Sequence, residues 1–112
     1  MQLKALLLTG PIFFSGITGN AANAAEKPVE LVLQDHVYRP SELRLPAGEP
    51  VVILLKNLDS TSEEFESEVL RVAQEVAANG EALINLKPMA PGRYPFIGED
   101  HEATAKGVLI VE

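Results

Sequence analysis

The pattern of hydrophobic and polar positions predicts short β-strands separated by turns. Val29–Gln34 alternates in part and Glu42–Leu45 alternates strictly, as half-buried strands do. Pro50–Asn57 contains the apolar run Val-Val-Ile-Leu-Leu, which indicates a central strand. Three further strands are expected over Ala82–Leu86, Arg93–Ile97 and Gly107–Val111.

The segments between the strands are typical of turns and loops: Asp35–Pro40, Pro46–Glu49, Asn57–Ser62, Asn79–Gly80 and Pro88–Gly92. Many short strands with Pro and Gly turns indicate an all-β sandwich.

The middle of the chain carries a helical spacing instead. Phe65, Val69, Val72 and Val76 recur at i, i+4, i+7 and i+11, which places them on one helical face. Thr61 and Glu64 stand at the spacing of a capping box. The local pattern therefore predicts a helix over Glu63–Ala77.

The first residues predict an export signal. Lys4 supplies the positive charge, Ala5–Gly19 is apolar but too short to span a membrane, and Ala22-Asn23-Ala24 is a cleavage sequence. We expect residues 1–24 to be a signal peptide cut after Ala24 or Ala25, and 25–112 to be one small periplasmic domain with no membrane insertion of its own. Lipid attachment is excluded because the chain has no cysteine.

Charge and composition narrow the classes of function. The formal net charge is −7, and removal of Lys4 with the signal leaves 8 basic against 16 acidic residues, a net charge of −8. Such a chain should repel nucleic acid and anionic lipid, and it suits cations or a basic protein partner. The absence of cysteine excludes disulfides and thiolate-bound metal.

His101 is the main candidate metal ligand, in a loop with Glu99, Asp100 and Glu102. Imidazole binds copper, zinc and iron, and carboxylates suit harder cations. A site made of His101 with Glu64, Glu66 or Glu99 would have nitrogen and oxygen ligands, which favours Cu(II), iron or Mn(II). The alternative is a solvated histidine among surface acids.

Two other residues are candidate ligands with plain structural alternatives. Met89, in the turn before Pro91, could offer a thioether to Cu(I), or it could fill the core as methionine often does. His36 lies in the first loop, which in a sandwich can approach a metal end; otherwise it is a surface histidine. No spacing indicates a catalytic triad, a phosphate loop or an acid–base pair.

Several motifs, in order, resemble the cupredoxin-like domain family. They are Tyr38-Arg39-Pro40, Leu45-Pro46-Ala47-Gly48 before the apolar strand, Glu64-Phe65-Glu66-Ser67, Pro91–Phe96, and the loop His101–Gly107 before the last strand. The resemblance implies a Greek-key β-sandwich. It also limits any helix to one or two turns between Ser62 and Ala78.

Within that family the chain looks most like small periplasmic members associated with bacterial high-affinity iron permeases. Glu63–Ser67, Gly98–His101 and Thr104–Gly107 carry this narrower match. The resemblance implies bound copper or iron, and an iron permease or a periplasmic iron-binding protein as partner. It places the usual copper ligands at Glu64, Gly98, His101 and Ala105, so only the second histidine is kept. A blue-copper centre with a thiolate is therefore excluded.

These observations leave three hypotheses. The first is a periplasmic metal-binding protein that assists iron uptake, with Fe(II) oxidation or electron transfer as an activity. The second is a metal-free module that docks a basic partner through its acidic loop end. The third is a metal chaperone or buffer without turnover. Enzymatic activity stays open, and a non-enzymatic role is the simpler expectation.

Overall fold

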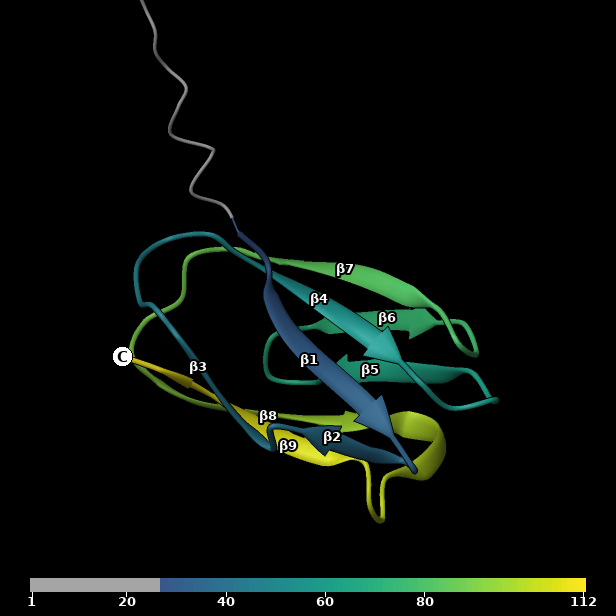
Figure 1. Cartoon of the computed structure of the whole chain (residues 1–112). Coiled ribbons are helices and arrows are strands. Elements are labelled where there is room, and N and C mark those ends of the chain that lie inside the picture. Colours follow the sequence, from purple (N-terminus) through teal and green to yellow (C-terminus); the bar gives the residue numbers. More distant parts are fainter. Residues whose placement is uncertain (1–26) are drawn as a thin grey trace, which may run out of the picture.

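The computed structural model describes residues 27–112 as nine strands and one 3₁₀ turn, arranged in two sheets (Figure 1). The expected all-β sandwich is confirmed. The signal peptide and its cleavage after Ala24 or Ala25 lie outside the described residues.

The first sheet has four strands in the order β2-β1-β4-β7. These are β1 (Val29–Gln34), β2 (Val37–Arg39), β4 (Val51–Asn57) and β7 (Glu81–Leu86). β1 pairs antiparallel with β2 and parallel with β4, and β4 pairs antiparallel with β7. The apolar run in β4 therefore lies inside a sheet, as its sequence predicts.

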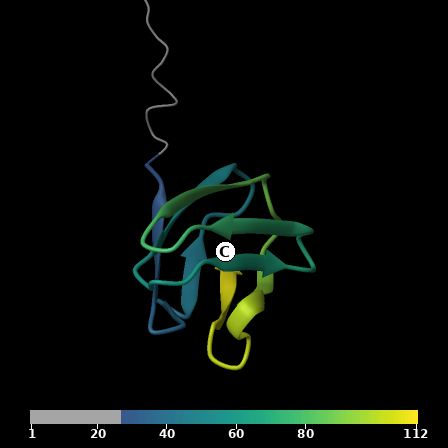
Figure 2. The same cartoon turned by 90° about the vertical axis from the view of Figure 1, so that its right-hand side faces the viewer.

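The second sheet has five strands in the order β3-β9-β8-β5-β6. They are β3 (Glu42–Leu45), β5 (Glu63–Ser67), β6 (Val72–Val76), β8 (Gly92–Gly98) and β9 (Lys106–Val111). The 3₁₀ turn η2 (Glu99–His101) joins β8 to β9. This turn and the β1–β2 turn lie at the same end of the molecule in both cartoon views (Figures 1 and 2).

The core lies between the two sheets and contains a cluster of three aromatic rings. Phe65 and Phe96 stack with ring centroids 4.9 Å apart, and Tyr38 meets Phe96 edge-on at 5.1 Å. All three side chains are almost fully buried. Alternation carries them inward, because side chains on one face of a strand recur every second residue. This cluster lies directly beneath the end of the sandwich that carries η2.

The helix predicted over Glu63–Ala77 is wrong, since this segment is the β5–β6 hairpin. Glu63 pairs with Val76 and Ser67 with Val72 across the two strands. Val69, expected on the buried helical face, lies in the turn and is 59% exposed. The strand pairings of β5 with both β6 and β8 outweigh the local preference.

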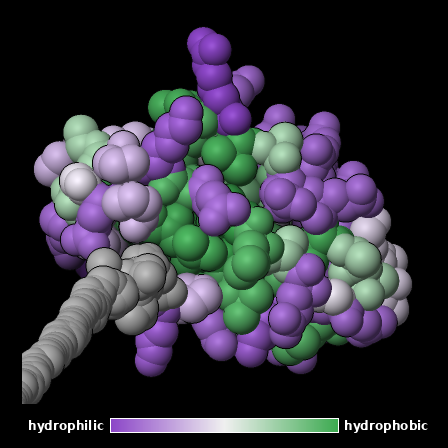
Figure 3. Space-filling view, turned by 90° about the horizontal axis from the view of Figure 1, so that it is seen from above, coloured by the Kyte–Doolittle hydropathy of each residue, from purple (hydrophilic) through white to green (hydrophobic). Residues whose placement is uncertain are grey.

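The outer surface of the first sheet is partly apolar. Leu83 of β7 is 54% exposed and pairs with Leu54 of β4. Figure 3 shows hydrophobic residues gathered at the middle of the side seen from above, with hydrophilic residues around them. Within residues 27–112 there is no helix long and apolar enough to cross a membrane.

Candidate functional site

The β1–β2 turn holds His36 at the end of the sandwich. Gln34 pairs with Val37, so Asp35 and His36 alone form the loop, and both have positive φ, 56° and 58°. This is the conformation of a two-residue type I′ hairpin turn, which favours Asn and Gly. The Asp59 carboxylate accepts hydrogen bonds from the N–H groups of Asp35 (2.6 Å) and His36 (2.9 Å). These bonds stabilise a turn whose backbone conformation glycine adopts more readily than aspartate or histidine.

The position and the charge of Asp59 both suit it to accept these hydrogen bonds. Its own N–H donates to the Asn57 side-chain oxygen at 2.9 Å, and Asn57 is buried at the end of β4. Partial desolvation opposes ionisation of Asp59. The N–H donors of His36 and Asp35, with the nearby imidazoles of His36 and His101, outweigh it and lower the pKa of Asp59.

His101 is oriented by a buried carboxylate, Glu63, which is only 1% exposed. One oxygen of Glu63 lies 2.7 Å from Nδ1 of His101. The other accepts hydrogen bonds from the N–H groups of Asp100 (2.7 Å) and Glu64 (3.2 Å). A carboxylate at Nδ1 favours the proton on that nitrogen, so Nε2 is left as the free lone pair.

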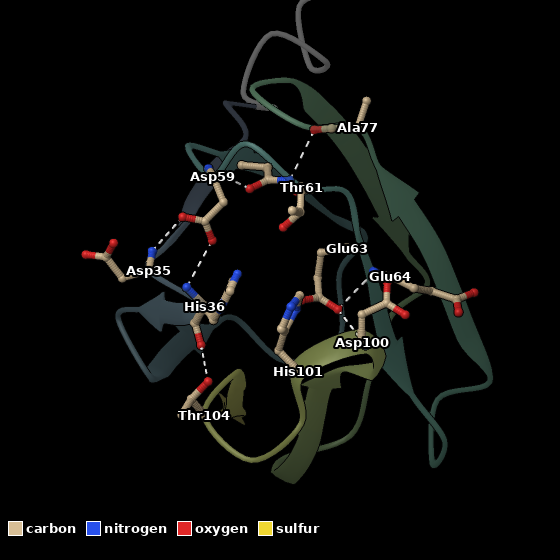
Figure 4. Close-up of polar contacts among 11 residues, drawn as sticks. Asp35, His36, Asp59, Thr61, Glu63, Glu64, Ala77, Asp100, His101 and Thr104 are labelled. Carbon is tan, nitrogen blue, oxygen red and sulfur yellow. Dashed lines mark hydrogen bonds and ion pairs between the residues drawn. The ribbon is translucent and has the colours of Figure 1, made fainter.

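The two imidazoles come together at this end although His36 and His101 are far apart in the sequence. Their rings are stacked, with centroids 3.6 Å apart and an interplanar angle of 11°. Thr104, in the loop after η2, donates its hydroxyl to the His36 carbonyl at 2.7 Å. Figure 4 shows His36 and Asp59 on one side of His101, and Glu63 and Asp100 on the other.

The expected carboxylate ligands do not join His101. Glu64 and Glu66 alternate with buried residues of β5 and so lie on the outer face of the second sheet, and Glu64 extends away from His101 in Figure 4. A hydrogen bond with the Glu99 carboxyl raises the pKa of Glu64, and desolvation and repulsion from Glu99, Glu66 and Asp100 add to it. Glu99 thus lies near Glu64.

Met89 also lies apart from the histidines. It is buried in the hydrophobic core, and its carbonyl accepts the N–H of Gly48 at 3.0 Å. Gly48 precedes the start of β4, whereas Asn57 is its last residue and the loop with Asp59 follows. Met89 therefore fills the core near the opposite end of the sandwich from His101.

The candidate ligands predicted from the sequence include Glu64 but not Glu63, which is the carboxylate in contact with His101. A Cβ on Gly98 would lie 2.7 Å from the Glu63 carboxyl carbon and 2.8 Å from the Ala105 Cβ. Glu63, Gly98, His101 and Ala105 thus lie close together. Phe65 is the signal in the sequence that could have identified Glu63. If Phe65 faces the core in a strand, Glu63 faces the core too, because residues 63 and 65 lie on the same face.

This convergent set does not fit blue copper. Gly98 and Ala105 bring no ligand atom, and the Glu63 carboxyl group fills the space beside Gly98. Within residues 27–112, no three His, Asp or Glu side chains are arranged to hold a metal ion. A metal ion that binds here would therefore need another arrangement of ligands, centred on the imidazoles.

The family model for the cupredoxin-like domain matches residues 5–111. This chain belongs to the cupredoxin-like domain family. It is also 34% identical over 83 residues to the uncharacterized protein RP394 of Rickettsia prowazekii (strain Madrid E). That match covers 74% of this chain and 66% of the relative, so this cupredoxin-like chain spans just under two thirds of the relative's length.

Solved cupredoxin-like structures share the fold. The Cu(I)-bound metal-binding domain of CopA, a Cu(I)-exporting P-type ATPase of Streptococcus pneumoniae, matches with TM-score 0.67 and 20% identity over 76% of this chain and 84% of that one. A mutant of amicyanin in its reduced Cu(I) form matches with TM-score 0.64 and 17% identity, over 82% and 89%. Reduced auracyanin of Roseiflexus castenholzii matches with TM-score 0.64 and 19% identity, over 76% and 96%. At these identities the likeness shows the fold alone.

Proposed function

We propose that this cupredoxin-like domain binds one transition metal ion at the end of the sandwich, through His101 and His36. The observation that carries the proposal is the meeting of the two imidazoles, one of them held by a buried carboxylate. Carboxylate–histidine pairs of this kind orient metal-binding imidazoles in many proteins.

His36 is the mobile partner in this proposal. The lone pairs of stacked imidazoles lie in two nearly parallel planes and cannot point at one ion, so both rings can bind it only if one of them turns. Glu63 fixes the ring of His101, whereas the hydrogen bonds of His36 involve its backbone N–H and carbonyl. Rotation about the His36 side-chain bonds would open the stack without moving the turn.

Cu(II) is the ion that this ligand set favours. Two neutral imidazoles with water or carboxylate oxygens suit Cu(II), and affinity at such sites peaks at copper among the first-row divalent ions. Iron and Mn(II) are weaker competitors for the same nitrogen atoms. The acids around the site, including Asp59 and Asp100, add attraction for any cation.

We further propose that the protein is a periplasmic accessory of iron uptake, with an iron permease or a periplasmic iron-binding protein as partner. The support is the resemblance of Glu63–Ser67 and Gly98–His101 to members associated with iron permeases. A bound copper would supply the redox chemistry that the side chains lack. Oxygen consumption with Fe(II) separates this role from plain metal buffering.

The test is calorimetric titration of the metal-stripped protein with Cu(II), and with Fe(II) and Mn(II) under anaerobic conditions. We expect Cu(II) to bind at micromolar concentration or tighter, and binding to weaken at least tenfold in His101→Ala and in His36→Ala. Glu64→Ala, on the outer face, is the matched control and should bind normally. Absence of binding by the unaltered protein would refute the metal function.

A further inference from the structure

The outer face of the second sheet carries a groove of about 410 Å³ beside η2. Pro95 and Ile97 of β8 line it along one strand, on either side of Phe96, whose ring is buried in the core, and Val69 of the β5–β6 turn lines it at one end. Glu66 pairs with Ile97 across β5 and β8, and the Ser67 hydroxyl donates to the Pro95 carbonyl at 2.9 Å. The apolar floor is thus built on two paired strands.

The groove has an acidic rim. Glu66, Glu68 and Glu102 complete its lining, and no lysine or arginine is part of it. Beyond the rim, Glu64 faces Glu75 across the β5–β6 pair. Like charges directly opposite each other in a sheet are destabilising, so this arrangement costs stability in the free protein. A cationic ligand would relieve that repulsion.

We propose that this groove binds a basic segment of a protein partner, with one apolar side chain anchored between flanking lysines or arginines. The volume accommodates a large apolar side chain, and the three carboxylates of the rim match positive charges on both sides of it. Lys106 lies opposite Ile97 on β9 and would repel the segment. The segment therefore runs over the β5–β6 side of the groove.

The proposal stands independently of metal binding, because none of the residues that line the groove is one of the two histidines. The test uses isotope-labelled protein in the presence of a chelator and at fixed ionic strength. The probe is a blocked pentapeptide, Lys-Lys-Leu-Lys-Lys, titrated while backbone amide signals are followed by NMR. We expect shifts confined to the neighbourhood of Glu66, Val69, Ile97 and Glu102.

Two comparisons separate groove binding from general attraction to an acidic protein. The double variant Glu66→Gln with Glu102→Gln should weaken binding at least fivefold. Glu49→Gln with Glu81→Gln removes the same charge from exposed positions outside the groove and should change binding less than twofold. Equal weakening by both pairs, or signals shifting over the whole surface, would overturn the proposal.

The apolar anchor has its own control. Replacing the leucine of the probe by serine keeps all four lysines, and we expect binding to fall at least threefold. Unchanged binding of the serine peptide would show that the floor of the groove takes no part, and would equally overturn the proposal. The amide spectrum of each variant reports in the same experiment that it is folded.

Discussion

The two oxygens of the Glu63 carboxylate have three nitrogen partners: the ring of His101 and the N–H groups of Asp100 and Glu64. Each partner belongs to the loop or strand that forms the candidate site. Buried donors without acceptors are costly, so this one side chain both positions His101 and satisfies the backbone around it.

Truncation of Glu63 should therefore destabilise the fold. We expect Glu63→Ala to lower the free energy of unfolding by about 1–3 kcal/mol, because it removes the acceptor of three part-buried hydrogen bonds. Glu63→Gln retains an acceptor oxygen and should cost less. Urea unfolding measures both, and an Ala variant as stable as the unaltered protein would contradict the role assigned to this carboxylate.

His36 combines backbone strain with a candidate function, since its φ of 58° is a conformation that glycine adopts freely. We expect His36→Gly to keep or raise stability by up to about 1 kcal/mol while Cu(II) binding weakens at least tenfold. Asp35→Gly relieves the same strain in the same turn and leaves both imidazoles. Thermal unfolding and calorimetry on the pair separate strain from binding; equal Cu(II) affinity in both would argue against His36 as a ligand.

The raised pKa of Glu64 gives a pH dependence with a definite sign. The folded state holds the proton of the Glu64 carboxyl more tightly than the unfolded chain does. This binding contributes to the free energy of unfolding at pH values below the ordinary glutamate pKa, and the contribution is lost as the pH rises through the raised pKa. Glu64→Gln should remove that loss and flatten the profile of urea midpoint against pH above the glutamate range. Glu81→Gln, exposed on β7, is the control and should leave the slope as it is.

At the scale of elements, alternation and turn residues predicted most strands. Val29–Gln34 and Glu42–Leu45 are strands with those bounds, and β4, β7, β8 and β9 begin or end within a residue of the expected positions. β2 was missed because three residues between a strained turn and Pro40 carry little pattern. The same turn brings His36 to the site, and no local signal in the sequence specifies its distance from His101.

The β5–β6 hairpin shows how a spacing can mislead. Phe65 and Val76 are buried, but they belong to two strands joined by a turn, and their helical spacing is a coincidence of hairpin length. The wrong helix also concealed Glu63, because residues 63 and 65 share a face in a strand but not in a helix. Once Phe65 is placed inward in a strand, Glu63 follows and Glu64 must face outward.

The hairpin predicts unequal costs for two similar substitutions. We expect Val76→Ala to lower the free energy of unfolding by about 1–3 kcal/mol, since Val76 is 1% exposed. Val69→Ala should change it by less than about 0.5 kcal/mol, because Val69 is exposed in the turn. Denaturant unfolding of the two variants compares them directly. Similar losses in both would favour a buried helical face.

At the scale of the whole molecule, the loop between β8 and β9 and the β1–β2 turn meet at one end of the sandwich, where the rings of His101 and His36 stack. A backbone hydrogen bond of 2.7 Å joins the N–H of Gly98 to the carbonyl of Ala105. The resemblance assigns copper ligands to Gly98, His101 and Ala105, and these three residues lie close together in the fold. The order of strands in the two sheets did not follow from any local pattern, since it depends on pairings between distant segments.

We predict that a blue-copper centre can be built at these positions. The triple variant Glu63→His, Gly98→Cys and Ala105→Met should bind Cu(II) with the intense blue absorption of a copper–thiolate bond. Gly98→Cys alone should destabilise the protein, because its Cβ would lie 2.7 Å from the Glu63 carboxyl carbon. Visible absorption after addition of Cu(II) checks the result; a colourless, folded triple variant would show that these positions cannot form such a centre.

The pairing of β3 with β9 has a consequence for how the chain folds. Glu42 pairs with Val108 in a parallel ladder, so β3 cannot join the second sheet as its edge strand until β9 has been made. Such long-range pairing slows folding, because the entropy of closing a large loop is lost before the stabilising contacts between the two strands form. A chain that emerges gradually from the ribosome therefore keeps β3 unpaired, and the sandwich open at that edge, until β9 has been made.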